Sequence, residues 1–186
     1  MKYPIYIYGM PVLRKVAQDV ELDKAKLDKL SADMFETLDA SGGIGLAAPQ
    51  IGKAVRVVVI DLDVLSEDLP DYKGFRRAFY NAHIIETGEE TETLEEGCLS
   101  LPGISEKVMR STQIHVAYYD EDLQQHDEWV GGYLARVMQH EFDHLEGRLF
   151  IDRLSPFRKR MLKSKLAAFL KGKVSCSYRV KTLKKV

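Results

Sequence analysis

The chain of 186 residues is 45% hydrophobic and 30% charged and has a formal net charge of -1. This composition is typical of a folded globular protein and excludes an intrinsically disordered chain. It contains neither a run of about 18 apolar residues nor a signal-peptide core, so we expect a cytoplasmic protein that contacts no membrane.

One domain is expected over residues 1–186, with a basic C-terminal helix and tail over residues 156–186. Residues 153–186 contain 12 of the 27 Lys and Arg residues and no Asp or Glu, whereas residues 1–152 contain all 28 acidic residues. The basic segment predicts either an anionic partner such as RNA, with no indication of DNA, or a solvated helix face. The two cysteines, Cys98 and Cys176, are too few for a disulfide framework.

The first predicted helix ends at residues 41–43, a Ser-Gly-Gly cluster. Its apolar residues recur at the three- and four-residue spacing of one helix face: Leu27, Leu30, Met34 and Leu38. The glycine-rich stretch 42–52 lacks phosphate-loop spacing, so it predicts close approach of the backbone to another chain segment or to a ligand. Residues 55–60, VRVVVI, predict a strand.

Residues 61–78 are polar and predict a surface excursion. Strands are predicted over 81–86 and 114–119, and the acidic turn 120–122 leads to a partner strand ending near Trp129 and Val130. A helix is expected between the glycine pair 131–132 and Gly147, and a last helix between Ser155 and Gly172 with Pro156 at its first position. The tail 173–180, KVSCSYRV, predicts a short strand.

The helix before Gly147 carries the pattern HExxH, formed by His140, Glu141 and His144. On a helix both imidazoles lie on one face and can bind one metal ion, and Glu141 lies beside them to take a proton from water. The alternatives are a surface helix with two histidines or a structural metal site. The isolated histidines are not expected to bind metal: His83, His115 and His126.

A third ligand must come from elsewhere. The protease pattern HExxHxxGxxH fails because Phe150 takes the place of its last histidine, and no glutamate follows Glu146 as another protease pattern requires. Asp152, Cys176 and Cys98 remain candidates. Cys98 is favoured because it lies in the turn-rich stretch EEGCLSLPG, and a thiolate with two imidazoles leaves one position of a tetrahedral ion open for catalysis.

Three motifs together resemble the signatures of the peptide deformylases: GIGLAAPQ at 43–50, EGCLS at 96–100 and QHEFDH at 139–144. GMPVLRKVA at 9–17 and LSP at 154–156 are similar to further family segments. Met10, the length of 61–78 and the tail KVSCSYRV depart from the family pattern. With the elements above, the resemblance implies an α+β fold, in which antiparallel and mixed β-sheets surround a central helix that carries HExxH, with an N-terminal and a C-terminal helix.

The resemblance implies a metal-dependent hydrolase that removes the formyl group from N-formylmethionyl ends of nascent peptides and releases formate. By motif position, Cys98, His140 and His144 would bind one divalent ion. Fe²⁺ is expected in the cell, and Zn²⁺, Ni²⁺ or Co²⁺ in the purified protein. Glu141 would act as general base and acid for the attacking water, while the Gln50 amide and the Leu99 N–H would donate to the formyl oxygen.

For the substrate, the resemblance implies that the backbone of Ile44 and Gly45 pairs with an extended peptide. Ile44 and Val137 either line a pocket for the methionine side chain or pack in the core. Glu96 and Arg110 match positions that the family uses near the site, or they form a surface ion pair. The ribosome is a candidate partner of the basic C-terminal helix. A zinc endopeptidase and a catalytically silent binding module are the competing hypotheses.

Overall fold

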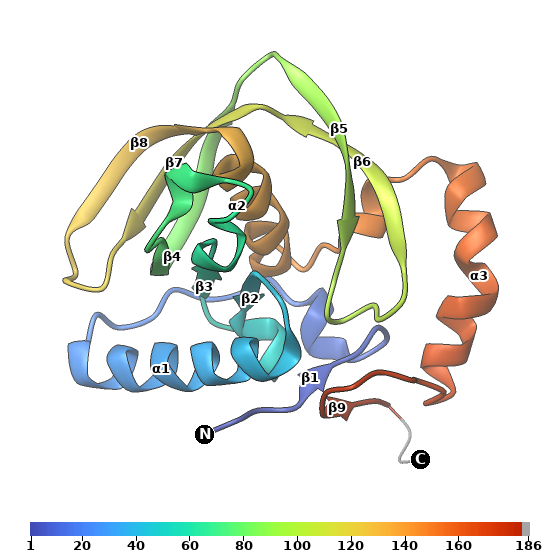
Figure 1. Cartoon of the computed structure of the whole chain (residues 1–186). Helices are drawn as coiled ribbons and strands as arrows, with labels where there is room; N and C mark the ends of the chain where they lie inside the picture. The colour runs from blue at the N-terminus through green and yellow to red at the C-terminus, as the bar shows by residue number, and fades with distance from the viewer. Residues whose placement is uncertain (184–186) are drawn as a thin grey trace.

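The computed structural model describes residues 1–183, and it confirms the α+β fold (Figure 1). The largest sheet has the strand order β2-β3-β4-β7-β8, and each neighbouring pair is antiparallel. These strands are β2 (Gly45–Ala47), β3 (Val57–Asp61), β4 (Arg76–Thr87), β7 (Gln113–Tyr119) and β8 (Gln125–Gly131). The other two sheets are the hairpin of β5 (Thr91–Gly97) and β6 (Ser105–Ser111), and the parallel pair of β1 (Ile5–Tyr6) and β9 (Val180–Lys181).

The α-helices in residues 1–183 are α1 (Lys24–Ser41), α2 (Gly132–Leu145) and α3 (Pro156–Leu170), as the sequence predicts. Figure 1 shows α2 in the middle of the molecule, between the large sheet and the β5–β6 hairpin, with α1 below and α3 at one side. The side chain of Asp23 caps α1 and that of Ser155 caps α3, each by accepting a backbone N–H of the first turn. None of the helices in residues 1–183 is long and apolar enough to cross a membrane.

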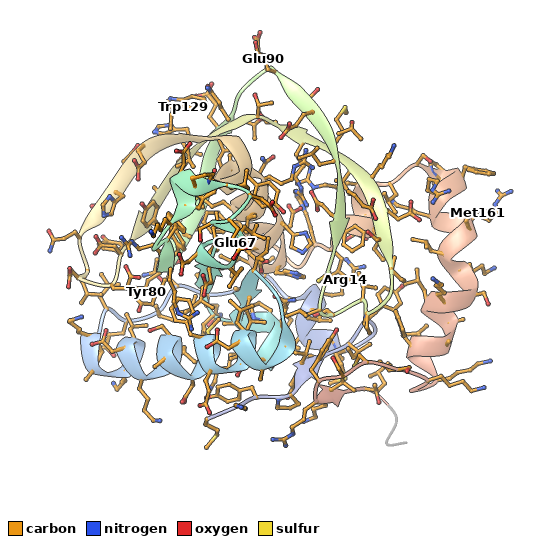
Figure 2. The ribbon with its side chains drawn as sticks, in the orientation of Figure 1. Arg14, Glu67, Tyr80, Glu90, Trp129 and Met161 are labelled. Atoms are coloured by element: carbon orange, nitrogen blue, oxygen red, sulfur yellow. The ribbon has the colours of Figure 1, made fainter. Side chains whose placement is uncertain are left out.

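Both faces of β3 are buried, which explains its run of valines. Val57 and Val59 pack in one apolar cluster that includes Met34 of α1, whereas Val58 and Ile60 pack in a second cluster with α2. Tyr80 of β4, labelled in Figure 2, is fully buried in the first cluster, and its hydroxyl donates to Ser31 of α1. The sheet therefore holds α1 and α2 on opposite sides.

The observed elements depart most from the predicted bounds in two places. The excursion 61–78 is shorter, because β4 begins at Arg76 and because Asp61 and Leu62 are buried rather than exposed. Of the predicted strand 173–180 only the last residue is in a strand, since pairing with β1 begins at Val180. Residues 184–186 of the predicted basic tail lie outside the described residues.

Candidate metal centre

One sulfur and two nitrogen ligands come together beside α2. Cys98 directly follows β5, and its Sγ atom lies with one ring nitrogen each of His140 and His144 in a group whose members are all within 4.8 Å of one another. Cys98 Sγ is 3.4 Å from His144 Nε2. No second group of three or more metal-ligating side chains occurs in residues 1–183. The fold thus brings together the three ligands that the sequence favours.

The two other candidate ligands have different partners. Asp152 forms an ion pair with Arg14 and accepts the backbone N–H of Leu149, while the Cys176 thiol donates to the Tyr178 carbonyl. The three isolated histidines pair with carboxylates outside the cluster: His83 with Asp19, His115 with Asp127, and His126 with Asp120 and Glu128. Among these side chains, only Cys98 is placed to join the histidine pair.

Glu96 fixes the orientation of His140. Its Oε2 atom is 2.9 Å from His140 Nδ1, so the other ring nitrogen, Nε2, is free to face Cys98. Arg110 donates to Glu96 from Nε and Nη2 at 2.6 and 2.9 Å, and Arg136 donates from Nη1 at 2.9 Å. Burial alone would raise the pKa of Glu96, but the hydrogen bonds from Arg110 and His140 lower it below its usual range. Glu96 is therefore a carboxylate that orients a candidate ligand.

Arg110 extends this network away from the cavity. Its side chain is fully buried, and Nη1 donates to Asp143 at 2.8 Å, which in turn accepts two hydrogen bonds from Arg153. Arg110 does not line the cavity described below, and its ion pair with Glu96 is buried rather than on the surface. A role of Arg110 in substrate binding stays a prediction. Arg110 holds the Glu96 carboxylate in place through its two hydrogen bonds. Sequence reasoning missed Asp143 and Arg136, although both lie within one turn of His140 on the same helix.

Glu141 is enclosed beside the candidate ligands. Only 4% of the residue is exposed, and its Oε2 atom is buried without a hydrogen-bond partner in residues 1–183. Burial raises the pKa of Glu141 to about 7 and lowers the pKa of the His144 imidazole to about 3. A carboxylate of this kind can take up and release a proton near neutral pH, and a neutral imidazole is the form that binds metal.

Two further predicted residues lie at the same point of the cavity. Gln50 is 1% exposed, and its Oε1 atom accepts the Ala47 N–H at 2.8 Å. This contact turns Nε2 toward Cys98 Sγ, 3.5 Å away, and toward Ser100 Oγ, 3.3 Å away. The Leu99 N–H has no hydrogen-bond partner within residues 1–183. The Gln50 amide therefore lies beside the sulfur of Cys98, and the next residue in the chain, Leu99, has an N–H that is free to donate.

A cavity of about 710 Å³ opens onto these groups. The predicted residues that line it are Ile44, Gly45, Gln50, Glu96, Cys98, Leu99, Val137, His140 and Glu141. His144 lies behind them and is 1% exposed. The C-terminal segment 175–178 forms part of the wall, although its Cys176 is not a member of the ligand group. The pairing of β9 with β1, which follows this segment, and the packing of Tyr178 against the first apolar cluster bring it back to the site.

The donor set fits a divalent transition metal. A thiolate and two imidazoles are the ligand types preferred by Zn²⁺ and shared by Fe²⁺, Co²⁺ and Ni²⁺, and a fourth position would remain for water or substrate. The unpartnered oxygen of Glu141 is where a water in that position would find a base. Residues Cys98, His140 and His144 therefore form a possible metal site with an open side facing the cavity.

Comparison with known proteins gives a consistent result. The family model described as polypeptide deformylase matches residues 2–160. The chain is 46% identical over 181 residues to a peptide deformylase of Cytophaga hutchinsonii, with 97% of each chain covered, and 40% identical over 192 residues to that of Flavobacterium psychrophilum, covering 100% and 99%. The crystal structure of Plasmodium falciparum peptide deformylase superposes with a TM-score of 0.81 at 35% identity, covering 90% of this chain and 95% of the other.

Proposed function

Because the chain belongs to the peptide deformylase family, whose members are metal-dependent hydrolases that remove the formyl group from new polypeptides, we propose that its cavity performs this reaction with Glu141 as general base and acid. Cys98, His140 and His144 would hold the ion, which when bound lowers the pKa of water and polarises the formyl oxygen. The buried, unpartnered Glu141 oxygen beside this ligand group is the observation that supports the proposal most strongly.

The protein groups divide the work of the reaction. Glu141 takes the proton of the attacking water and passes it to the leaving amine, for which a pKa of about 7 is well matched. Negative charge that develops on the formyl oxygen meets the Gln50 amide and the Leu99 N–H. These donors are held by the fold before substrate arrives, which is the condition for effective oxyanion stabilisation.

The peptide part of the substrate is expected to add to β2, because β2 is an edge strand of the large sheet. The N–H of Asp61, the last residue of β3, donates to the carbonyl oxygen of Ile44, so Ile44 and Asp61 form a hydrogen-bonded pair. In an antiparallel ladder the N–H and C=O of the next residue, Gly45, then point away from β3 and toward the free edge. Ile44 and Val137 line the cavity and form an apolar surface for the methionine side chain.

Fe²⁺ is the proposed ion in the cell, with Zn²⁺, Ni²⁺ or Co²⁺ as replacements in purified protein. A ferrous ion with a thiolate ligand is oxidisable, so an iron-loaded enzyme should lose activity in air faster than a nickel- or zinc-loaded one. Metal analysis of anaerobically purified protein, paired with formate release from a formyl-methionyl peptide, identifies the ion. Little iron, or iron protein as stable in air as nickel protein, would count against ferrous iron.

Exchange of Glu141 for glutamine tests the proposed mechanism. Glu141→Gln keeps the size of the side chain but cannot carry the proton, so formate release should fall by about a hundred- to ten-thousand-fold with the metal content unchanged. Glu86→Gln on the exposed end of β4 is the matched control. Full activity of Glu141→Gln would exclude this role, and absence of formate release by the wild type would favour a silent binding module.

We further propose that the chain acts on N-formylmethionyl nascent peptides in the cytoplasm, as one catalytic domain over residues 1–186. The basic helix α3 is the candidate contact with the ribosome, because Arg160 and Lys163 on it are exposed. Neutralising both to glutamine should weaken ribosome cosedimentation and make it less salt-dependent. The double exchange of Lys73 and Lys107, which are also exposed, is the control. Equal cosedimentation of both double variants would refute the contact.

A further inference from the structure

The C-terminal segment contacts the turn that carries Cys98 and Leu99. In Figure 1 this turn, between β5 and β6, points toward the chain between α3 and β9. The Tyr178 hydroxyl donates to the Leu99 carbonyl oxygen at 2.8 Å, and the Tyr178 side chain lines the cavity. Tyr178 lies outside residues 2–160, the part of the chain that the family model matches. This contact is therefore a feature of the chain beyond the family motifs.

The donor and the acceptor of this hydrogen bond are both well anchored. Tyr178 is partly buried against the first apolar cluster, and the strand that follows it is tied to β1 by a hydrogen bond from Ile5 N–H to Arg179 O of 2.8 Å. The end of the β1 segment holds the same turn, because Tyr8 N–H donates to Ser100 O at 2.9 Å. Burial raises the pKa of Tyr178, so its hydroxyl remains a donor throughout the neutral range.

We propose that Tyr178 is a positioning residue for the reaction, acting through Leu99. By holding the Leu99 carbonyl, the hydroxyl restricts rotation of the backbone on either side of that residue and so keeps the unpartnered N–H of Leu99, a residue that lines the cavity, in one orientation. Without the hydroxyl, the Leu99 carbonyl loses its side-chain donor. The turn, still held by the hydrogen bond from Leu101 N–H to Cys98 O, then gains freedom at the backbone angles of Leu99. The N–H would then meet the formyl oxygen in only part of the molecules.

The inference rests on the proposed function and is tested with Tyr178→Phe, which removes one oxygen and keeps the ring. Tyr118→Phe is the matched control, since Tyr118 is also partly buried and donates a hydrogen bond of 2.8 Å, but to Glu128 outside the cavity. Loss of a complete oxyanion donor costs about a hundred- to a thousand-fold in turnover. A misaligned donor should cost less, so we expect kcat of Tyr178→Phe to fall about tenfold with KM changed less than about twofold.

A second measurement is independent of turnover. In the zinc-loaded full chain, the amide resonance of Leu99 in a ¹H–¹⁵N spectrum should shift in Tyr178→Phe and stay in place in Tyr118→Phe. Bound zinc and the melting temperature are measured on both variants, and assays are run well below both melting temperatures. An unchanged zinc stoichiometry is expected, because the Tyr178 hydroxyl donates to a backbone carbonyl and not to the ligand group of Cys98, His140 and His144.

The possible outcomes separate the two hypotheses. Unchanged kcat in Tyr178→Phe overturns the inference, and so does a change confined to KM or to the melting temperature, since either would reflect binding or folding alone. An unmoved Leu99 resonance overturns it as well. Failure of the wild type to release formate would reject the proposed function instead, and the Leu99 resonance would still decide whether Tyr178 orients that amide.

Discussion

Gly45 lies directly against the carboxylate of Glu141. A methyl carbon at Gly45 would be 2.5 Å from Glu141 Oε1 and 2.9 Å from its Cγ, distances that real Cβ contacts do not reach. The glycine-rich stretch 42–52 predicts that backbone approaches something closely, and at Gly45 this neighbour is the side chain proposed to move the proton. The strand β2, whose free edge is expected to bind the substrate, is therefore packed through Gly45 against the side chain proposed as the base.

Gly45→Ala should consequently impair turnover more than folding. The methyl group would displace the Glu141 carboxylate by a fraction of an ångström or more, and misplacement of a catalytic group by about 1 Å can cost on the order of a hundredfold. We expect kcat for formate release to fall about 10- to 100-fold. Gly131→Ala is the control, because the nearest atom to its new methyl group is 3.5 Å away. If Gly45→Ala kept kcat within about twofold, Glu141 would not depend on this contact.

Glu96→Gln should weaken metal binding. It removes the negative charge that orients His140 and leaves Arg110 and Arg136 without their shared counter-ion. Loss of a group that orients a metal-binding histidine typically costs 10- to 100-fold in affinity, and we expect about this change in the zinc Kd measured by competition with a chromogenic chelator. Glu90→Gln, at the exposed tip between β4 and β5 in Figure 2, should bind zinc normally. Equal affinities would refute the orienting role.

The hairpin of β5 and β6 shows where sequence reasoning fails for this fold. The inward positions of β6 are Glu106, Val108 and Arg110, so its period-two pattern is not one of apolar and polar residues. The charge of Glu106 is neutralised by Arg158 of α3, and that of Arg110 by Glu96 of β5 and Asp143 of α2. Because a hydrophobic pattern identifies a strand only when its buried face is apolar, neither strand of the hairpin could be bounded from its composition.

The candidate site also contains residues that the sequence predicts and residues that it does not. His140, Glu141 and His144 are predictable because a helix brings residues four apart to one face, and Cys98 because its turn-rich surroundings and family motif single it out. Arg153 and Tyr178 could not be predicted, since each reaches the site only through tertiary contacts, with Asp143 and with the Leu99 carbonyl. The sequence therefore predicts the candidate ligands better than the groups that orient them.

Arg158→Met should destabilise the fold without changing turnover. Arg158 of α3 donates two hydrogen bonds, of 2.8 and 2.7 Å, to Glu106, whose side chain is 7% exposed. Half of the arginine is exposed to solvent, so we expect a loss of only about 1–2 kcal/mol, or roughly 3–7 °C in Tm. Arg160→Met, which changes an exposed residue of the same helix, should leave Tm unchanged. A Tm for Arg158→Met equal to that of the control would show that this ion pair does not secure α3.

Removal of the metal should lower the free energy of unfolding of the protein. The variants Cys98→Ser and Cys176→Ser should differ in how much of this effect they retain. A ligand present at about 100 times its Kd adds about 2.7 kcal/mol to the free energy of unfolding, so chelation should lower Tm by about 5–10 °C. Cys98→Ser should lose most of this difference, because Cys98 Sγ belongs to the ligand group. Cys176→Ser should retain it, since its thiol lines the same cavity but donates to the Tyr178 carbonyl. If Cys98→Ser kept the full change in Tm on chelation, or if Cys176→Ser lost it, the assignment of Cys98 as the third ligand would be wrong.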